Sequence, residues 1–137
     1  MRAQILLAIA ALPLLAASAS ANITARVSNG SQRMQVYVGD RLTYSWPVST
    51  ARRGFWTPPG YYRVQRMERM WHSRKYGMAP MPYSLFFHGG YAIHGTSAVG
   101  QLGRPASHGC VRLAPGNART LFGLAQRYGG AQVVVTN

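Results

Sequence analysis

The run Ser107-His108-Gly109-Cys110-Val111-Arg112-Leu113 carries the single cysteine of the 137-residue chain. His108 lies two residues before Cys110, and a second histidine, His94, lies sixteen residues upstream in the run His94-Gly95-Thr96. A thiol with imidazoles nearby is the usual arrangement for an activated nucleophile. Because the thiolate is the reactive form, we expect an imidazole to lower the pKa of Cys110.

The first residues of the chain have the features of an export signal. One positive charge, at Arg2, precedes an apolar run from Ile5 to Ala17, and small residues follow. The Ala19-Ser20-Ala21 site predicts cleavage before Asn22, and a cut before Ser20 is the alternative. The apolar run is short for a membrane-spanning helix, which needs about 20 residues. We therefore expect residues 1–21 to be a signal peptide and residues 22–137 to form one exported domain, soluble in the periplasm or cell wall.

Export makes the single cysteine informative. Exported proteins normally pair their cysteines in disulfides, so a lone one indicates intermolecular pairing or a reactive thiol. A buried structural thiol is the plain alternative, because free cysteines are commonly buried and inert. A zinc site of His94, His108 and Cys110 is a third reading, but it lacks a carboxylate or second cysteine and has no usual zinc spacing. We expect neither a metal nor a cofactor.

The chain is strongly basic. Fifteen Lys and Arg residues stand against two acids, Asp40 and Glu68, and the formal net charge is +13. Such a charge implies an anionic partner: nucleic acid, a membrane surface or a cell-wall polymer. Export argues against nucleic acid, the basic residues are scattered, and no nucleic-acid-binding motif is present. Neither acid is well placed to orient a histidine, so we infer that a backbone carbonyl near Gly95 does so.

Residue patterning predicts a mainly β fold. Strands 32–38 and 41–48 are expected to form a hairpin across Gly39-Asp40, and strands 84–88 and 91–94 a second across Gly89-Gly90. Further strands are expected at 61–66 and 132–135.

One helix is expected in the C-terminal half of the chain, at residues 115–128. Pro115 suits its first turn, and Gly129-Gly130 ends it. Residues 22–31 are predicted to be a loose N-terminal lead. The predicted loops are 52–60, 67–82 and 99–106, and the second of these has the length of a functional lid.

These motifs resemble the catalytic domain of the L,D-transpeptidases, the YkuD-type family of bacterial cell walls. The resemblance rests on His94-Gly95-Thr96 and on Ser107 to Leu113. Supporting matches are Thr57-Pro58-Pro59-Gly60, Met81-Pro82-Tyr83-Ser84 and Gly90-Tyr91-Ala92-Ile93. The matches extend over residues 57–113, and the flanking strands and helix fit the same domain. The family implies a β-sandwich-like domain with Cys110 in its groove.

The resemblance also implies a reaction on the tetrapeptide stem of peptidoglycan. Cys110 attacks the carbonyl of the third stem residue, and the terminal D-alanine leaves. The acyl group then passes to an amine. Transfer to an amine of another stem cross-links the wall, and transfer to an amine of a wall-anchored lipoprotein anchors that lipoprotein. His94 is implied to be the general base. Gly109 and Cys110 are implied to contribute backbone donors to the oxyanion hole.

Other residues take supporting roles by the same resemblance. Ser107, His108 and Gly95 shape the site. Arg112 is expected either to brace the Cys110 loop or to bind a carboxylate of the stem. The rings of Tyr83 and Tyr91 are expected to line the groove.

Two further readings stay open at this point. Water in place of the amine would make the chain an L,D-carboxypeptidase or L,D-endopeptidase, because the acceptor leaves no mark on the nucleophile. A non-catalytic, basic wall-binding protein is the other, and it is disfavoured because no catalytic position is missing.

Overall fold

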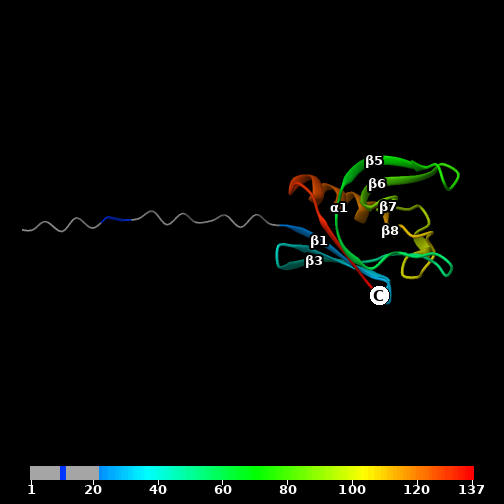
Figure 1. Cartoon of the computed structure of the whole chain (residues 1–137), viewed down its shortest axis with the longest axis horizontal. Helices are drawn as coiled ribbons and strands as arrows, with labels where there is room; N and C mark the ends of the chain where they lie inside the picture. The colour runs from blue at the N-terminus through cyan, green and yellow to red at the C-terminus, as the bar shows by residue number, and fades with distance from the viewer. Residues whose placement is uncertain (1–9, 12–21) are drawn as a thin grey trace, which may run out of the picture.

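Two β-sheets and one α-helix are formed by residues 22–137 (Figure 1). The computed structural model describes residues 10–11 and 22–137, so the predicted signal peptide falls, apart from those two residues, outside the described residues. Within the described ranges, no helix is both long enough and apolar enough to cross a membrane.

The first sheet has five strands in the order β3-β2-β1-β9-β4. Its strands are β1 (Ile23–Ser28), β2 (Arg33–Val38), β3 (Arg41–Pro47), β4 (Gly60–Arg63) and β9 (Gln132–Thr136). The second sheet has four strands in the order β5-β6-β7-β8. Its strands are β5 (Arg66–Ser73), β6 (Ala79–His88), β7 (Tyr91–Gly95) and β8 (Val111–Leu113).

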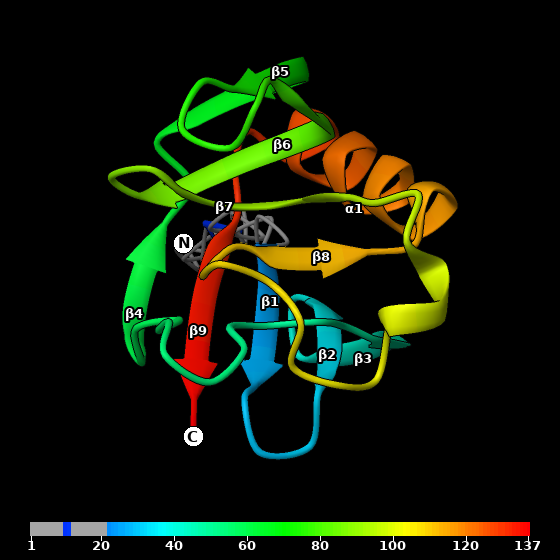
Figure 2. The same cartoon turned by 90° about the vertical axis from the view of Figure 1, so that its right-hand side faces the viewer.

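The two sheets enclose a common apolar core together with helix α1 (Pro115–Arg127). Strands of the two sheets cross steeply in Figure 2, and α1 lies against β6 and β7. In β1 and β6, alternate residues face the core, namely Ala25 and Val27 of β1 and Leu85 and Phe87 of β6. The predicted mainly β, sandwich-like fold with one helix in the C-terminal half is confirmed.

Both predicted hairpins are present, with β2–β3 paired across Gly39-Asp40 and β6–β7 across Gly89-Gly90. The predicted helix over 115–128 ends one residue earlier, at Arg127. The predicted closing strand is β9, which pairs in parallel with β1. Between β7 and β8 the predicted loop contains one turn of 3-10 helix, Val99–Gln101.

The prediction of a loose lead over residues 22–31 is wrong. Six of these residues form β1, which lies between β2 and β9 in the first sheet. Ile23, Ala25 and Val27 are fully buried, while Thr24 and Arg26 alternate with them on the other face. The period-two pattern of this strand is short and includes an alanine, so its apolar face gives only a weak strand signal.

The prediction of a long loop over residues 67–82 is also wrong. This stretch forms most of the β5–β6 hairpin, and only residues 74–78 are a turn. Pro80 and Pro82 hid the strand, because proline lacks the N–H that a central strand needs. Strand β7 pairs with β6 only from Leu85 onward, so the proline stretch is paired with β5 alone and tolerates the missing donors.

One buried side chain ties the first sheet to the segment that supports the site. Gln32 donates through Nε2 to the carbonyl of Asn29 at 2.8 Å and to Oγ1 of Thr50 at 2.6 Å. Its Oε1 accepts the N–H of Thr50 at 2.9 Å. These bonds satisfy polar groups that would otherwise be buried without partners. They fix the stretch after β3, residues 48–52, at the edge of β8 and the loop before it.

Candidate active site

A cavity of about 620 Å³ opens on the face of the second sheet that points away from the shared core. On β6, Leu85 and Phe87 enter the core, whereas Phe86 joins a smaller cluster on the opposite face, against which Cys110 packs. Six of the predicted site residues line the cavity: Tyr91, His94, Ser107, His108, Cys110 and Arg112. In the described part of the chain, no aspartate or glutamate lines it, and no group of side chains that could hold a metal ion occurs.

Parallel pairing of β7 with β8 brings the cysteine and the upstream histidine together. His94 lies on β7 in register with Arg112, and Ile93 is in register with Val111. Cys110 directly precedes Val111, and it lines the same cavity as His94 although sixteen residues separate them in sequence. The thiol is half-buried, and Sγ lies 3.9 Å from the carbonyl oxygen of Gly90.

His94 is held in one orientation by its neighbour's backbone. Its ring is only 6% exposed, and Nδ1 lies 2.7 Å from the carbonyl oxygen of Gly95. A carbonyl can only accept, so Nδ1 carries the proton and Nε2 keeps a free lone pair. The backbone carbonyl expected to take the place of a carboxylate is therefore present.

Burial keeps both members of the pair neutral. It lowers the pKa of His94 to about 4, against a partial rise from the Gly95 hydrogen bond, and the charge of Arg112 lowers that pKa further. Burial also raises the pKa of the Cys110 thiol, more than the Ala92 backbone and Arg112 lower it. The expectation that an imidazole lowers the thiol pKa is therefore not met, and at neutral pH the cavity holds a neutral thiol and an uncharged imidazole.

The hydroxyl of Ser107 folds the cysteine loop onto itself. It donates to the carbonyl oxygen of Cys110 at 2.6 Å and accepts the N–H of Gly109 at 3.0 Å. Ser107 is fully buried. The N–H of Gly109 is thus used within the loop, so its expected role as an oxyanion donor is not available in this conformation. The N–H of Cys110 is the donor that remains of the two predicted.

A second hydroxyl, that of Thr57, anchors the same loop from outside. It donates to the carbonyl oxygen of Gly109 at 2.7 Å and accepts the N–H of Ala51 at 3.0 Å. Main-chain bonds in both directions join Ser49 to Arg112, at 3.1 and 2.9 Å. Thr57 was part of a sequence motif but had no predicted role, because the motif does not reveal that its partner is Gly109, 52 residues away.

Gly109 is required by a neighbouring ring. Its φ is +133°, in the region that favours glycine, and an added Cβ would lie 2.7 Å from Cε1 of Tyr91. The same Cβ would lie 3.0 Å from the carbonyl oxygen of Trp56. Tyr91 therefore packs directly on the backbone beside the cysteine. Close packing of this ring, rather than backbone access to an oxyanion, accounts for the glycine.

His108 is held between two aromatic side chains that sequence reasoning missed. Its ring stacks on Tyr76 with centroids 4.1 Å apart and planes 12° apart, and Phe55 meets it edge-on at 4.8 Å. Tyr76 belongs to the turn of the β5–β6 hairpin, so the hairpin tip contacts the cysteine loop here. Partial burial, then the charges of Arg52, Arg112 and Lys75, lower the pKa of His108. No periodic signal marked Tyr76, because it lies in a turn.

Of the two roles expected for Arg112, the hydrogen bonds in the structure correspond to bracing of the Cys110 loop. Its Nη1 donates to Oε1 of Gln101 at 3.2 Å and lies 3.5 Å from the carbonyl oxygen of Ala106. The side chain also lines the cavity, where its charge acts on both His94 and Cys110.

Tyr83 does not line the cavity, contrary to expectation. Its φ is +53°, and its ring packs edge-on against Phe122 of α1 with centroids 5.5 Å apart. The ring therefore belongs to the core side of β6. Gly95 lies behind the site, where its backbone carbonyl orients His94 and an added Cβ would approach Pro82 and Ala118 to 3.1 and 3.3 Å.

The sequence of residues 22–135 matches the family model of the YkuD domain, the L,D-transpeptidase catalytic domain. A comparison with curated proteins found no match.

Several solved structures share the fold. An L,D-transpeptidase from Mycobacterium smegmatis has 22% identity and a TM-score of 0.76, with 85% of this chain and 59% of that chain covered. One from Stackebrandtia nassauensis has 26% identity and a TM-score of 0.73, covering 85% and 56%. L,D-transpeptidase 3 from Mycobacterium tuberculosis, in complex with a faropenem-derived adduct, has 21% identity and a TM-score of 0.74, covering 85% and 61%. The chain thus spans less than two thirds of the length of these structures.

The Thr57 anchor predicts a pair of contrasting variants. Thr57→Val keeps the side-chain shape but leaves the Gly109 carbonyl and the Ala51 N–H without their partner. We expect it to lower the free energy of unfolding by about 1–3 kcal/mol and to slow the reaction of Cys110 with a small electrophile. Thr57→Ser, which retains the hydroxyl, is the matched control and should stay close to the wild type in both. Urea unfolding and thiol labelling of all three proteins measure this, and equal behaviour of the two variants would contradict it.

Burial of His94 predicts a pH-dependent stability. Its folded pKa of about 4 lies below the ordinary 6.5, so between these values the unfolded chain binds a proton that the folded chain does not. Stability should therefore fall as pH drops from 6.5 to 4, by up to about 3 kcal/mol. Denaturant titrations over that range should give a flatter profile for His94→Asn than for the wild type. Parallel profiles would show that His94 is not the buried neutral group described here.

Proposed function

Because the chain belongs to the YkuD family of L,D-transpeptidase catalytic domains, we propose that it is a cysteine acyltransferase acting on the tetrapeptide stem of peptidoglycan. The observation that carries the proposal is that Cys110 lines the same cavity as a buried histidine, whose Nδ1 is held by the Gly95 carbonyl and whose Nε2 keeps a free lone pair. A neutral imidazole and a neutral thiol are the two partners that general-base activation requires.

In the first half-reaction Cys110 forms a thioester with the stem. Nε2 of His94 takes the thiol proton while sulfur attacks the carbonyl carbon of the third stem residue. The carbonyl oxygen becomes an oxyanion, and the N–H of Cys110 is the backbone donor that we propose for it. The tetrahedral intermediate then collapses, the bond to the terminal D-alanine breaks, and the leaving amine takes the proton from His94.

In the second half-reaction the acyl group passes to an amine. The amine of a second stem, or of a wall-anchored lipoprotein, attacks the thioester, and His94 accepts the proton that this amine loses. Collapse of the second intermediate releases the thiolate, which recovers its proton from His94. The chain returns to the neutral resting pair, and no cofactor takes part.

The cavity lining supports a substrate that carries carboxylates. Arg66, Arg74, Lys75 and Arg112 line it, and none of its described lining residues is acidic. Arg66 is engaged by aromatic rings, with its guanidinium 4.4 Å from the Trp71 centroid and 4.1 Å from that of Phe86. Lys75 and Arg74 belong to the hairpin turn and are exposed. An electropositive cleft concentrates an anionic substrate at its mouth.

Export is part of the proposal, since the substrate lies outside the cytoplasm. Arg2, the apolar run that follows and the Ala19-Ser20-Ala21 site support removal of residues 1–21 and a location in the periplasm or cell wall. Sizing the chain recovered from the exported fraction of an expressing cell would test this, because retention of the uncleaved chain in the cytoplasm contradicts it.

The direct test of the reaction is mass spectrometry of the protein after incubation with peptidoglycan tetrapeptide fragments. We expect an adduct equal to the stem without its terminal D-alanine, mapped to Cys110 and absent from Cys110→Ala. Adding an amine acceptor should discharge the adduct into a cross-linked product. A hydrolysed tripeptide as the main product, with the amine present, would assign the chain to the carboxypeptidases or endopeptidases. Turnover by a folded Cys110→Ala protein would exclude the nucleophile.

The assignment of the base makes a separate prediction. Single-turnover acylation should be about 10²–10⁴-fold slower in His94→Ala than in the wild type, which is the usual effect of removing a general base. His108→Ala loses its stacking on Tyr76 and should be affected less, because its ring is held in the hairpin contact. The reverse ranking, measured at one pH, would transfer the role to His108.

A further inference from the structure

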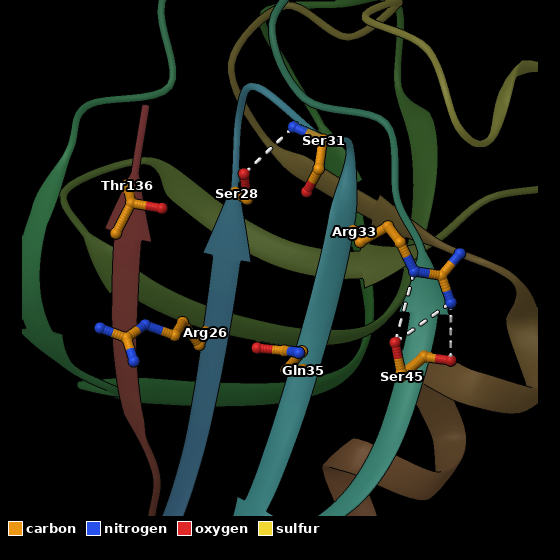
Figure 3. Close-up of a pocket in the computed structure, with 7 residues that line it drawn as sticks. All are labelled: Arg26, Ser28, Ser31, Arg33, Gln35, Ser45 and Thr136. Carbon is orange, nitrogen blue, oxygen red and sulfur yellow. Dashed lines mark hydrogen bonds between the residues drawn. The ribbon is translucent and has the colours of Figure 1, made fainter.

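A second concavity lies on the outer face of the first sheet, away from the cavity that holds Cys110. Its volume is about 310 Å³ (Figure 3). Along β1 and β2, the residues Ala25, Val27 and Val36 enter the core, so the alternating residues Arg26 and Arg33 face outward. The reaction proposed for the cleft uses none of the residues on this face.

Two guanidinium groups form opposite sides of this concavity. In Figure 3 the side chain of Arg26 extends across β9, whereas that of Arg33 extends toward β3. Arg33 is held there by Ser45, through bonds to Oγ from Nε at 3.3 Å and Nη2 at 3.1 Å and a bond from Nη2 to the carbonyl oxygen at 3.1 Å. Ser28 and Gln35 lie between the two arginines.

The strands of this sheet supply no acidic side chain to balance its arginines, and Asp40 lies in the β2–β3 turn outside the concavity. None of the five strands contains an aspartate or glutamate, and the described residues that line the concavity are arginine, serine, threonine and glutamine. Guanidinium groups bind carboxylates through paired, charge-assisted hydrogen bonds, and hydroxyl and amide groups suit the hydroxyls of sugars. Side chains of this kind in a concavity favour a polar, anionic ligand over a lipid.

The spacing of the arginines favours a linear ligand. β9 and β3 are separated by three strand intervals, about 14 Å at the usual spacing between neighbouring strands. Arg33 is held over β3 by Ser45 and Arg26 extends over β9, so in this arrangement a chain with repeated acidic groups fits both guanidinium groups better than a single small anion does. Tyr61 of β4 lies on the same face, in register with Val134, which is in turn opposite Arg26, and it is 85% exposed. Its ring offers an apolar platform with a polar end, as sugar rings require.

We propose that the outer face of the first sheet binds a linear acidic polysaccharide, whose carboxylates are held by Arg26 and Arg33 and whose sugar rings contact Tyr61. This site would hold the protein on a wall polymer while the cleft on the opposite side acts. It does not rest on the reaction proposed for Cys110.

The test measures binding of polygalacturonate oligomers by calorimetry in the Cys110→Ala background, so that catalysis plays no part. At about 0.1 M salt, where the Debye length is about 10 Å, long-range attraction between exposed charges is largely screened. The Arg26→Gln/Arg33→Gln double variant should bind at least about tenfold more weakly, from the loss of two charge-assisted contacts. Tyr61→Ala should also bind more weakly, and neutral dextran should not bind to any of the proteins.

The matched control is Arg119→Gln/Arg127→Gln, which removes the same charge from exposed positions on α1. It should keep the affinity of its Cys110→Ala parent, and melting temperatures should show that every variant is folded. If the two double variants weaken polygalacturonate binding equally, the effect comes from net charge alone, and that result would contradict the proposed site. Binding to phosphatidylglycerol vesicles that depends on Arg26 and Arg33, without binding to polygalacturonate, would assign the face to a membrane surface and overturn it as well.

Discussion

The candidate site depends on the two hydrogen bonds that the Ser107 hydroxyl makes within the cysteine loop. By accepting the N–H of Gly109 and donating to the carbonyl of Cys110, this hydroxyl turns three consecutive peptide groups into a closed loop. Thr57 then ties that loop to the segment after β3, and Gln32 ties that segment to the first sheet. The position of the sulfur is therefore fixed by buried hydrogen bonds that reach across both sheets, each of them costly to break.

The same burial that fixes the loop sets its electrostatics. Removing the thiol and the imidazole from water disfavours their charged forms, so the pKa of Cys110 rises and that of His94 falls. Arg112 is the one charge that acts on both, and it favours the thiolate while opposing the imidazolium. In the proposed reaction the thiolate therefore forms only during attack, when His94 takes the proton, and it is not present in the resting protein. A neutral resting thiol would suit the proposed export, because the thiolate is the form that oxidises.

Sequence reasoning recovered the parts of this molecule that are marked by local chemistry. The lone Cys110 with His94, the hairpins at Gly39-Asp40 and Gly89-Gly90, and the proline-to-glycine limits of α1 were all visible as short-range signals. The structural features that the sequence did not predict depend on contacts between distant segments. β1 is a strand because β2 and β9 pair with it, and β6 contains prolines because one of its edges is open there. The ring of Tyr83 packs on Phe122 because its backbone adopts a left-handed conformation, and no local sequence signal predicts that conformation.

The proposed chemistry requires that Cys110 and His94 are both neutral at rest, and titration of the thiol measures the state of Cys110 directly. The ultraviolet absorbance of the Cys110 thiolate, followed against pH with Cys110→Ala as the blank, should appear only above the ordinary pKa of a cysteine. At neutral pH the wild type and the blank should be indistinguishable. Thiolate absorbance that is already complete between about pH 5 and 7, as in cysteines paired with a charged imidazole, would contradict the account.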